Sequence, residues 1–481
     1  MKKVISLILM MIIVICMLGI QPIVLAKQET KTKYDSIIDF SKQQLNITKT
    51  EVPKNLFPRN MSISDQKWHA VKASDWTSGF FPGLLWYIYQ YTGDISWKNE
   101  AIARTQVLDA QKYNNHTHDI GFMMFDSFGN GYRLTKSQQY KKTLLTSART
   151  LASRYNPKVG CIRSWDKGSW KYPVIIDNMM NTELLFWAAK NGGSNDLYKI
   201  ALSHCLKTAK NHVRADGSTY HVVDYNPANG KVISKCTAQG YANESVWSRG
   251  QAWAIYGFTM AYRYTKDERM LETAIKVSNY YINNLPEDYV PYWDFKAPHL
   301  KNEEKDTSAA AIAASGLFEL SGYVKGNESE RYRRTAVNTI KSLASPAYLA
   351  KGTQSHGILL HSVGSHPDGQ EIDNSIIYTD YYFVESLAKY KIIIAGELKA
   401  PPIAAFTVSP NTGKAPLTVT FKDKSTNNPV SWSWNFGDKS ISTVQNPVHQ
   451  YAKAGKFTVK LTVKNFEGNN WVIKKSYVNV K

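Results

Sequence analysis

The sequence predicts an all-α (α/α)6 barrel of six helical hairpins, followed by a small β-sandwich of the immunoglobulin-like kind. Apolar residues recur at helical spacing from residue 34 to about 395. The connections between the predicted helices alternate between short and long. After residue 402, apolar and polar residues alternate and β-branched and aromatic types are frequent, as in "KFTVKLTVKNF". This second pattern is typical of strands.

Twelve helical segments are expected in the first region. They span residues 34–46, 79–92, 97–112, 119–131, 136–154, 177–190, 194–213, 247–264, 268–284, 307–322, 328–345 and 375–391. Short turns follow the even-numbered segments and long loops follow the odd-numbered ones. Antiparallel pairing then gives six hairpins, and closing them into a ring buries both faces of the inner helices. All long loops lie at one end of such a ring, which is where we expect a site.

The first residues predict an export signal. Two lysines precede an apolar stretch from residue 4 to 19, and "VLA" before Lys27 matches a small-x-small cleavage pattern. The alternative is a retained membrane anchor, because the apolar run is longer than a typical signal core. In either case we expect a secreted or cell-surface protein. The expected domains are a signal peptide (1–26), a catalytic barrel (27–395), a linker (396–402) and a β-sandwich (403–481).

The amino-acid composition excludes some classes of protein and partner. Of 481 residues, 43% are hydrophobic, which excludes a disordered chain, and the 13 Trp and 29 Tyr favour carbohydrate binding through ring stacking. The net charge of +20 comes mainly from lysine, without an arginine-rich helix, so no nucleic-acid partner is expected. A merely solvated basic surface explains most of these lysines, although a basic exported protein could attract an anionic polysaccharide or a negatively charged cell envelope. Such a partner would bind through the β-sandwich, for which a spacer role is the alternative. Three cysteines outside the signal predict no disulfide framework, although a single bridge stays open.

Asp119 and Asp177 are the candidate catalytic residues. Each begins a predicted helix after a long loop, among Ile, Phe and Met side chains. Either one alone is explained as an N-cap. If the two converge, desolvation and mutual repulsion would raise the pKa of one carboxyl group and keep it protonated near neutrality. That arrangement describes a general acid beside a charged neighbour.

Other polar and aromatic residues share the long-loop end. Arg249 either binds an anionic substrate group or pairs with a carboxylate in the barrel wall. His118 and His221 are either site residues or core histidines bonded to backbone. Gln239 would orient water or a sugar hydroxyl, unless it is a surface amide. Three tryptophans would stack on sugar rings if they line a cleft, and otherwise belong to the core: Trp76, Trp165 and Trp253.

No cofactor site is expected. The His, Asp and Glu residues have no metal-site spacing. The sequence also contains neither a phosphate-binding loop nor a GxSxG nucleophile motif.

Several long blocks resemble the unsaturated glucuronyl hydrolases of glycoside hydrolase family 88. They are "DWTSGFFPGLLWYIYQYTGD", "HDIGFMMF", "DNMMNTELLFWAA", "WSRGQAWAIYGF", "YWDF", "DTSAAAIAASGL" and "IIYTDYYFVESLAKY", in order across about 34–395. The blocks "WNFGDKS", "NPVHQY" and "GKFTVKLTV" resemble a PKD domain, the polycystic-kidney-disease type of β-sandwich.

The resemblance implies a hydration mechanism without a cofactor. Such enzymes act on lyase-generated oligosaccharides that end in a 4,5-unsaturated uronic acid. By motif position, Asp177 would be the general acid/base and Asp119 its partner carboxylate. The substrate subsite would contain Trp76, His118, Trp165, His221, Gln239, Arg249 and Trp253.

One loop departs from the pattern of family members that favour sulfated glycosaminoglycans. Those members carry a Ser-x-Ser-x-Lys element, whereas the corresponding loop here reads "HSVGSHPDGQEID". Three rivals stay open: a related unsaturated rhamnogalacturonyl hydrolase, an ordinary inverting glycosidase that uses both aspartates, and a non-catalytic surface protein that binds polyanions.

Overall fold

A computed structural model describes residues 34–62, 66–299, 302–397, 402–426, 429, 431–465 and 468–481. The predicted signal peptide, residues 1–26, lies outside the described residues. Within the described part of the chain, no helix is both long enough and apolar enough to cross a bilayer. The description below therefore covers the helical domain and the β-sandwich.

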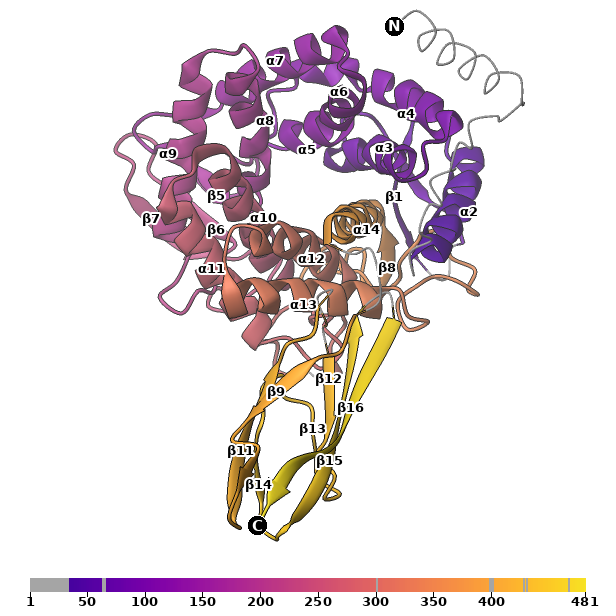
Figure 1. The fold of residues 1–481 in the computed structure, drawn as a ribbon. Helices are drawn as coiled ribbons and strands as arrows, with labels where there is room; N and C mark the ends of the chain where they lie inside the picture. Colours follow the sequence, from indigo (N-terminus) through magenta and orange to yellow (C-terminus); the bar gives the residue numbers. More distant parts are fainter. Residues whose placement is uncertain are drawn as a thin grey trace, which may run out of the picture.

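The inner helices of the described residues form a closed ring (Figure 1). Each element contacts the next, and the last contacts the first. Long runs of consecutive residues are buried in these elements, as in Ser248–Ala261 of α10, which explains why their sequences are apolar on all sides. The inner elements are α3 (Phe80–Thr92), α5 (Ile120–Met124) with its continuation, α8 (Asn178–Lys190), α10 (Ser248–Thr265), α12 (Thr307–Ser321) and α14 (Ile377–Glu397).

Six outer helices cover the ring (Figure 1). Their apolar residues occupy one face; α11 buries Met270, Ala274, Val277 and Tyr281, which repeat every three to four residues. The outer helices are α2 (Asp35–Glu51), α4 (Ile95–Val107), α7 (Gln138–Ala152), α9 (Asn195–His212), α11 (Glu268–Asn283) and α13 (Gly326–Leu343). The predicted (α/α)6 barrel is confirmed, because all twelve predicted segments are helical and the short and long connections alternate as expected.

One predicted helix differs in detail. The segment expected at 119–131 begins as α5, passes through a π-helical stretch (Phe125–Gly129) and ends as α6 (Asn130–Thr135). The π-helical stretch inserts a wider turn into the inner helix.

The long loops contain short strands that the helical pattern did not predict. The termini of the barrel are joined by the sheet β2–β1–β8, in which β1 (Phe57–Ser62) pairs with β2 (His69–Val71) and with β8 (Asn374–Ile376). Two further sheets are formed by β3 (Tyr155–Asn156) with β4 (Cys161–Ile162), and by β5 (Pro173–Ile175), β6 (Val222–Tyr225) and β7 (Val232–Cys236). The cysteines Cys161, Cys205 and Cys236 are free thiols.

The C-terminal domain is the predicted β-sandwich (Figure 1). Trp434 is fully buried at its centre, with Phe406 and Phe421 against its ring. One sheet has the order β14–β11–β9: β9 (Phe406–Ser409), β11 (Leu417–Asp423) and β14 (Val448–Tyr451). The other has the order β10–β16–β15–β12–β13: β10 (Thr412–Gly413), β12 (Ser431–Asn435), β13 (Ile441–Ser442), β15 (Gly455–Asn465) and β16 (Gly468–Val480).

Gly121 allows α5 and α8 to approach closely. A Cβ atom at this position would come within 2.5 Å of the Asn181 Cα atom. We therefore expect Gly121→Ala to destabilise the fold by about 1–3 kcal/mol, the usual cost of overpacking a core. Denaturant unfolding of the variant measures this loss. Gly322→Ala is the control: Gly322 is exposed, its φ is −79°, and a Cβ would meet only the Glu319 carbonyl oxygen at 3.3 Å. Equal unfolding midpoints for the two variants would contradict the expectation.

Candidate active site

Asp119 and Asp177 lie at the N-termini of two neighbouring inner helices. Asp119 immediately precedes α5, Asp177 immediately precedes α8, and these helices contact each other. Neither side chain caps its helix by a hydrogen bond. Both residues thus occupy the N-cap positions of their helices, as one expectation stated, but a capping hydrogen bond does not explain their carboxyl groups. The two carboxyl groups are close enough for the charge of Asp119 to raise the pKa of Asp177.

The carboxyl group of Asp177 is held in a setting that favours its protonated form. Burial and the charge of Asp119 raise its pKa to about 7. The positive charge of Arg249 acts in the opposite direction but does not cancel the increase. The side chain is 14% exposed, and its Oδ2 atom has no hydrogen-bond partner among the described residues. The raised pKa therefore allows Asp177 to hold a proton near neutral pH, which an ordinary aspartic acid does not.

His221 points a nitrogen at this carboxyl group. Its Nδ1 atom accepts hydrogen bonds from the backbone N–H groups of Ala238 (3.1 Å) and Gln239 (3.3 Å). The proton of the neutral ring must therefore be on Nε2, which lies 3.7 Å from Asp177 Oδ2. Burial and the nearby charge of Arg249 lower the His221 pKa well below its usual value, so the ring is neutral. His221 is thus bonded to backbone, which was one of the two expectations, and it also lies beside Asp177 in the candidate site.

His118 lies beside Asp119 in the same way as His221 lies beside Asp177. The Oδ1 atom of Asn181 accepts from the backbone N–H of Phe122 (2.8 Å), so the Asn181 Nδ2 group donates to His118 Nδ1 (3.0 Å). This bond assigns the ring proton to Nε2, which lies 3.3 Å from Asp119 Oδ1. Burial lowers the His118 pKa, so this ring is neutral as well. Each aspartate therefore has a neutral histidine beside it, although neither Nε2 atom makes a hydrogen bond among the described residues.

Arg249 pairs with a wall carboxylate, as one of the two expectations stated. Its guanidinium lies 3.1 Å from Asp306 Oδ2 and donates to the backbone carbonyls of Val363 and Gly364. The side chain is buried, with the Trp247 ring 4.4 Å from its centre. Because its charge also lowers the Asp177 pKa, Arg249 contributes to the electrostatics of the site from this position.

Gln239 is half-buried and is not a surface amide. Its Nε2 group donates to the Gly364 carbonyl at 3.1 Å, the same carbonyl that Arg249 binds. Both residues thus hold the loop 361–373 at the long-loop end of the barrel. This is the loop that departs from the sulfate-binding pattern.

The three tryptophans have different surroundings. Trp76 is half-buried and contacts Phe122, which in turn contacts the buried Trp253, with ring centroids 5.8 and 5.2 Å apart. Trp253 is fully buried, and its Nε1 atom has no partner among the described residues. Trp165 is half-buried, with its ring perpendicular to that of His221 at 5.8 Å. Trp253 is therefore a core residue, which was the alternative expectation, whereas the half-buried Trp76 and Trp165 stay candidates for stacking on a sugar ring.

Three residues near the candidate active site were not predicted from the sequence. Asp306 begins an inner helix after a long loop, in the same way as Asp119 and Asp177. The pattern that pointed to those two aspartates would therefore also have pointed to Asp306. Asn181 is one helical turn beyond Asp177 on α8 and orients His118. Tyr378 is buried near Arg249, and its hydroxyl has no partner among the described residues. Only the fold brings these last two residues to the site.

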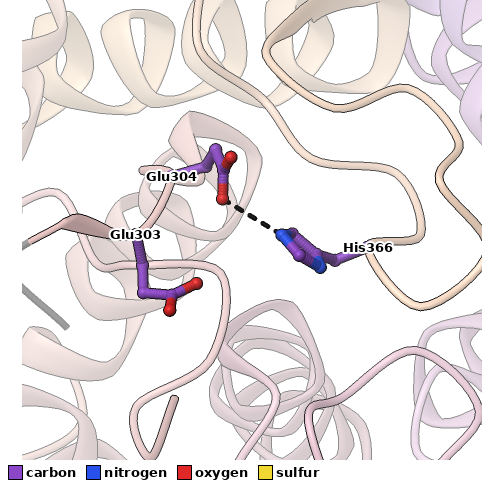
Figure 2. A group of neighbouring side chains, drawn as sticks. All are labelled: Glu303, Glu304 and His366. Atoms are coloured by element: carbon purple, nitrogen blue, oxygen red, sulfur yellow. Dashed lines mark hydrogen bonds and ion pairs between the residues drawn. The ribbon is translucent and has the colours of Figure 1, made fainter. Parts of the chain in front are cut away.

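One group of potential metal ligands lies between the loop 361–373, which contains His366, and the segment that contains Glu303 and Glu304 (Figure 2). His366 Nε2 is 3.1 Å from Glu304, and Glu303 accepts a hydrogen bond from the Trp293 indole at 2.8 Å. The Trp293 ring also stacks on His366 at 4.0 Å. This group includes none of the predicted site residues, and its contacts connect residues 302–306 with the loop 361–373.

A cavity of about 460 Å³ lies at the opposite, short-turn end of the barrel. Its lining includes charged groups from the C-terminal parts of inner helices, and several of these groups form ion pairs with one another. Arg263 lies 3.1 Å from Glu183 and 2.9 Å from Glu319. None of the predicted site residues lines this cavity, so the candidate active site is the cluster at the long-loop end.

The raised pKa of Asp177 makes a prediction about stability. Between pH 3.8 and about 7 the folded protein binds this proton more tightly than the unfolded chain, so the contribution of Asp177 decreases as pH rises. Asp177→Asn removes this dependence. We expect the variant to gain stability relative to the unmodified protein as pH rises across this range, by up to about 1.4 kcal/mol per unit. Denaturant midpoints at pH 5 and pH 8 measure the gain, and a constant difference would contradict a raised pKa.

Known proteins share both parts of this chain. The family model for Glycosyl Hydrolase Family 88 matches residues 48–391, and the model for the PKD domain matches residues 399–480. The unsaturated glucuronyl hydrolase of Formosa agariphila is 46% identical over 349 residues, which are 71% of this chain and 86% of that protein. The unsaturated chondroitin disaccharide hydrolase of Streptococcus pneumoniae is 32% identical, over 76% of this chain and 93% of that one.

A solved structure agrees with these relatives. The crystal structure of an unsaturated glucuronyl hydrolase specific for heparin is 41% identical and has a TM-score of 0.72, covering 75% of this chain and 98% of that chain. The resemblance seen in the sequence blocks is confirmed. The chain belongs to glycosyl hydrolase family 88 and carries a C-terminal PKD domain.

Proposed function

We propose that this protein is an unsaturated glucuronyl hydrolase. It removes the 4,5-unsaturated uronic acid from the non-reducing end of lyase-generated oligosaccharides by hydrating the vinyl ether double bond. The single observation that carries the chemistry is Asp177, a carboxyl group with a pKa of about 7 beside a second carboxyl group. The relatives with 46% and 41% identity support the substrate class.

Asp177 acts as the acid in the first step. Its proton is transferred to C4 of the sugar, and the electron pair of the double bond forms the new C–H bond. Protonation of carbon is intrinsically slow, so a donor with a pKa near the working pH is advantageous. The positive charge that develops at C5 and the ring oxygen is stabilised by the Asp119 carboxylate.

Water completes the reaction at C5. Its oxygen bonds to C5, and its proton returns to the carboxylate of Asp177, which regenerates the acid. The product is a hemiketal at C5. Opening of its ring leaves a hemiacetal at C1, whose collapse releases the remaining sugar. Each step balances without a cofactor.

The two histidines lie beside the carboxyl groups without carrying a charge. The Nε2 atom of His221 is 3.7 Å from Asp177 Oδ2, and that of His118 is 3.3 Å from Asp119 Oδ1. A protonated imidazole beside Asp177 would favour the carboxylate and lower the pKa of the acid. The burial that keeps His221 neutral therefore also preserves the proton donor.

The barrel itself favours an anionic substrate. All six inner helical elements begin at the long-loop end, so their N-termini converge on the site. The N-terminus of a helix carries a partial positive charge and attracts anions. This positive field suits the carboxylate of the uronic acid, and Arg249 adds a buried full charge nearby.

The loop 361–373 favours unsulfated substrates. Its basic side chains are already paired: His361 with Asp373 at 2.5 Å, and His366 with Glu304 at 3.1 Å. The loop contains no lysine. A sulfate group placed against this loop would therefore meet no free cation from it.

Loss of the acid provides the first functional test. We expect Asp177→Asn to lower kcat by at least about a hundredfold while the fold is retained, because an amide cannot donate the required proton. The assay follows the loss of ultraviolet absorbance of the C4–C5 double bond in lyase-made disaccharides. In the unmodified protein, kcat should also fall as pH rises above about 7, where Asp177 loses its proton. A variant that keeps most of its turnover would remove Asp177 from this role.

A panel of disaccharides tests the substrate and the rivals. We expect kcat/KM to be at least tenfold higher for unsulfated than for sulfated unsaturated disaccharides. Preference for a rhamnose-linked unsaturated disaccharide would instead indicate the rhamnogalacturonyl rival. Cleavage of saturated sugars alone would indicate an inverting glycosidase, and absence of any turnover a binding protein.

We also infer export of the protein from the pattern in residues 1–26, with the domain boundaries expected from the sequence. Mass spectrometry of the protein secreted by its host would find Lys27 as the first residue. An intact Met1 or a longer retained segment would contradict cleavage at this position.

A further inference from the structure

The PKD domain is strongly basic. Residues 403–481 contain eleven lysines, no arginine and three acidic residues, a net charge of +8. A charge of this size on a small domain attracts anionic partners and repels cationic ones. It is not required for packing, because lysines tolerate almost any exposed position.

The outer face of the five-stranded sheet carries two of these lysines, Lys460 and Lys464, beside an exposed aromatic ring. Trp471 on β16 is 57% exposed and Ile473 is 42% exposed. Residues of one strand face alternate, so both side chains lie on the same side of the sheet. The opposite side packs into the core, where Leu461 and Val463 are fully buried.

Strand pairing places polar groups beside these apolar ones. Trp471 pairs with Thr462, which pairs with Ser433 on β12; Ile473 pairs with Lys460 in the next row. Adjacent strands lie about 4.8 Å apart, so the three strands present a surface about 10 Å wide. The exposed side chains of this surface, which we call the outer sheet face, are Ser431, Ser433, Asn435, Lys460, Lys464, Asn469, Trp471 and Ile473, with the half-buried Thr462 among them.

A lysine already lies against the aromatic ring. The Lys460 Nζ atom is 5.4 Å from the centre of the Trp471 ring. A sugar ring stacked on Trp471 would therefore have a positive group within reach of its substituents. Serine, threonine and asparagine in the neighbouring rows supply donors and acceptors for hydroxyl groups.

We propose that the outer sheet face binds an anionic polysaccharide chain, with a sugar ring on Trp471 and its acidic groups beside Lys460 and Lys464. Charge complementarity selects this occupant over a neutral polymer, and the flat exposed tryptophan favours sugar rings. Binding of polymer at this face holds the barrel at a high effective concentration of chain ends. The proposal does not depend on the function assigned to the barrel.

The test uses the full chain and affinity electrophoresis in gels that contain hyaluronan, polygalacturonate or neutral dextran. We expect retardation by at least one of the two acidic polymers, none by dextran, and weakening as salt rises. Trp471→Ala should reduce the retardation at least about tenfold, and Trp471→Tyr should retain most of it, because tyrosine preserves the stacking surface.

Charge reversal supplies the matched comparison. Lys460→Glu with Lys464→Glu should abolish retardation. Lys422→Glu, an exposed position on β11 in the other sheet, should leave most of it. Turnover of a small unsaturated disaccharide should be unchanged in all these variants. Unaltered retardation of the Trp471→Ala and Lys460→Glu/Lys464→Glu variants, equal retardation by dextran, or binding only to phosphatidylserine vesicles would overturn the proposal.

Discussion

The proposed chemistry of this protein depends on one buried carboxyl group beside another. Asp177 is placed at the start of an inner helix, where the helix N-terminus and Arg249 would ordinarily stabilise its ionised form. Burial and the charge of Asp119 oppose them and prevail, which raises the pKa to about 7. A neutral His221, rather than a charged one, faces the carboxyl group. The protonated state thus results from a balance that the surrounding residues maintain.

The barrel brings the N-termini of the inner helices together, and this places Asp119 close to Asp177. Glycine at 121 lets α5 and α8 approach, and a Cβ at Gly257 on α10 would come within 2.5 Å of Met179 on α8. Rigid inner helices then fix the backbone positions of both aspartates, whereas the long loops add Gln239 and the segment 361–373. This division between a fixed acid pair and an adaptable loop is consistent with relatives that share the fold and are named for different substrates.

The fold could be predicted from the sequence because the pattern that indicates it occurs many times. Helical spacing and alternating connection lengths recur six times, so errors of a few residues at helix ends did not matter. The aspartates were predicted as site residues because each follows a long loop and begins an apolar helix, and the structure places their carboxyl groups close together. The partners of Arg249 were not identified, since Asp306 and the Gly364 carbonyl are 57 and 115 residues away in sequence. The short strands were missed for the same reason, because pairing such as that of β1 with β8 leaves no local pattern.

The most direct test is the titration of the Asp177 carboxyl group itself, by carbon NMR or by infrared difference spectroscopy against Asp177→Asn. The account predicts an apparent pKa of about 7 in the unmodified protein, and a lower value in Asp119→Asn, where the neighbouring charge is gone. A pKa near the ordinary value of 3.8, or one that does not respond to the loss of Asp119, would contradict it.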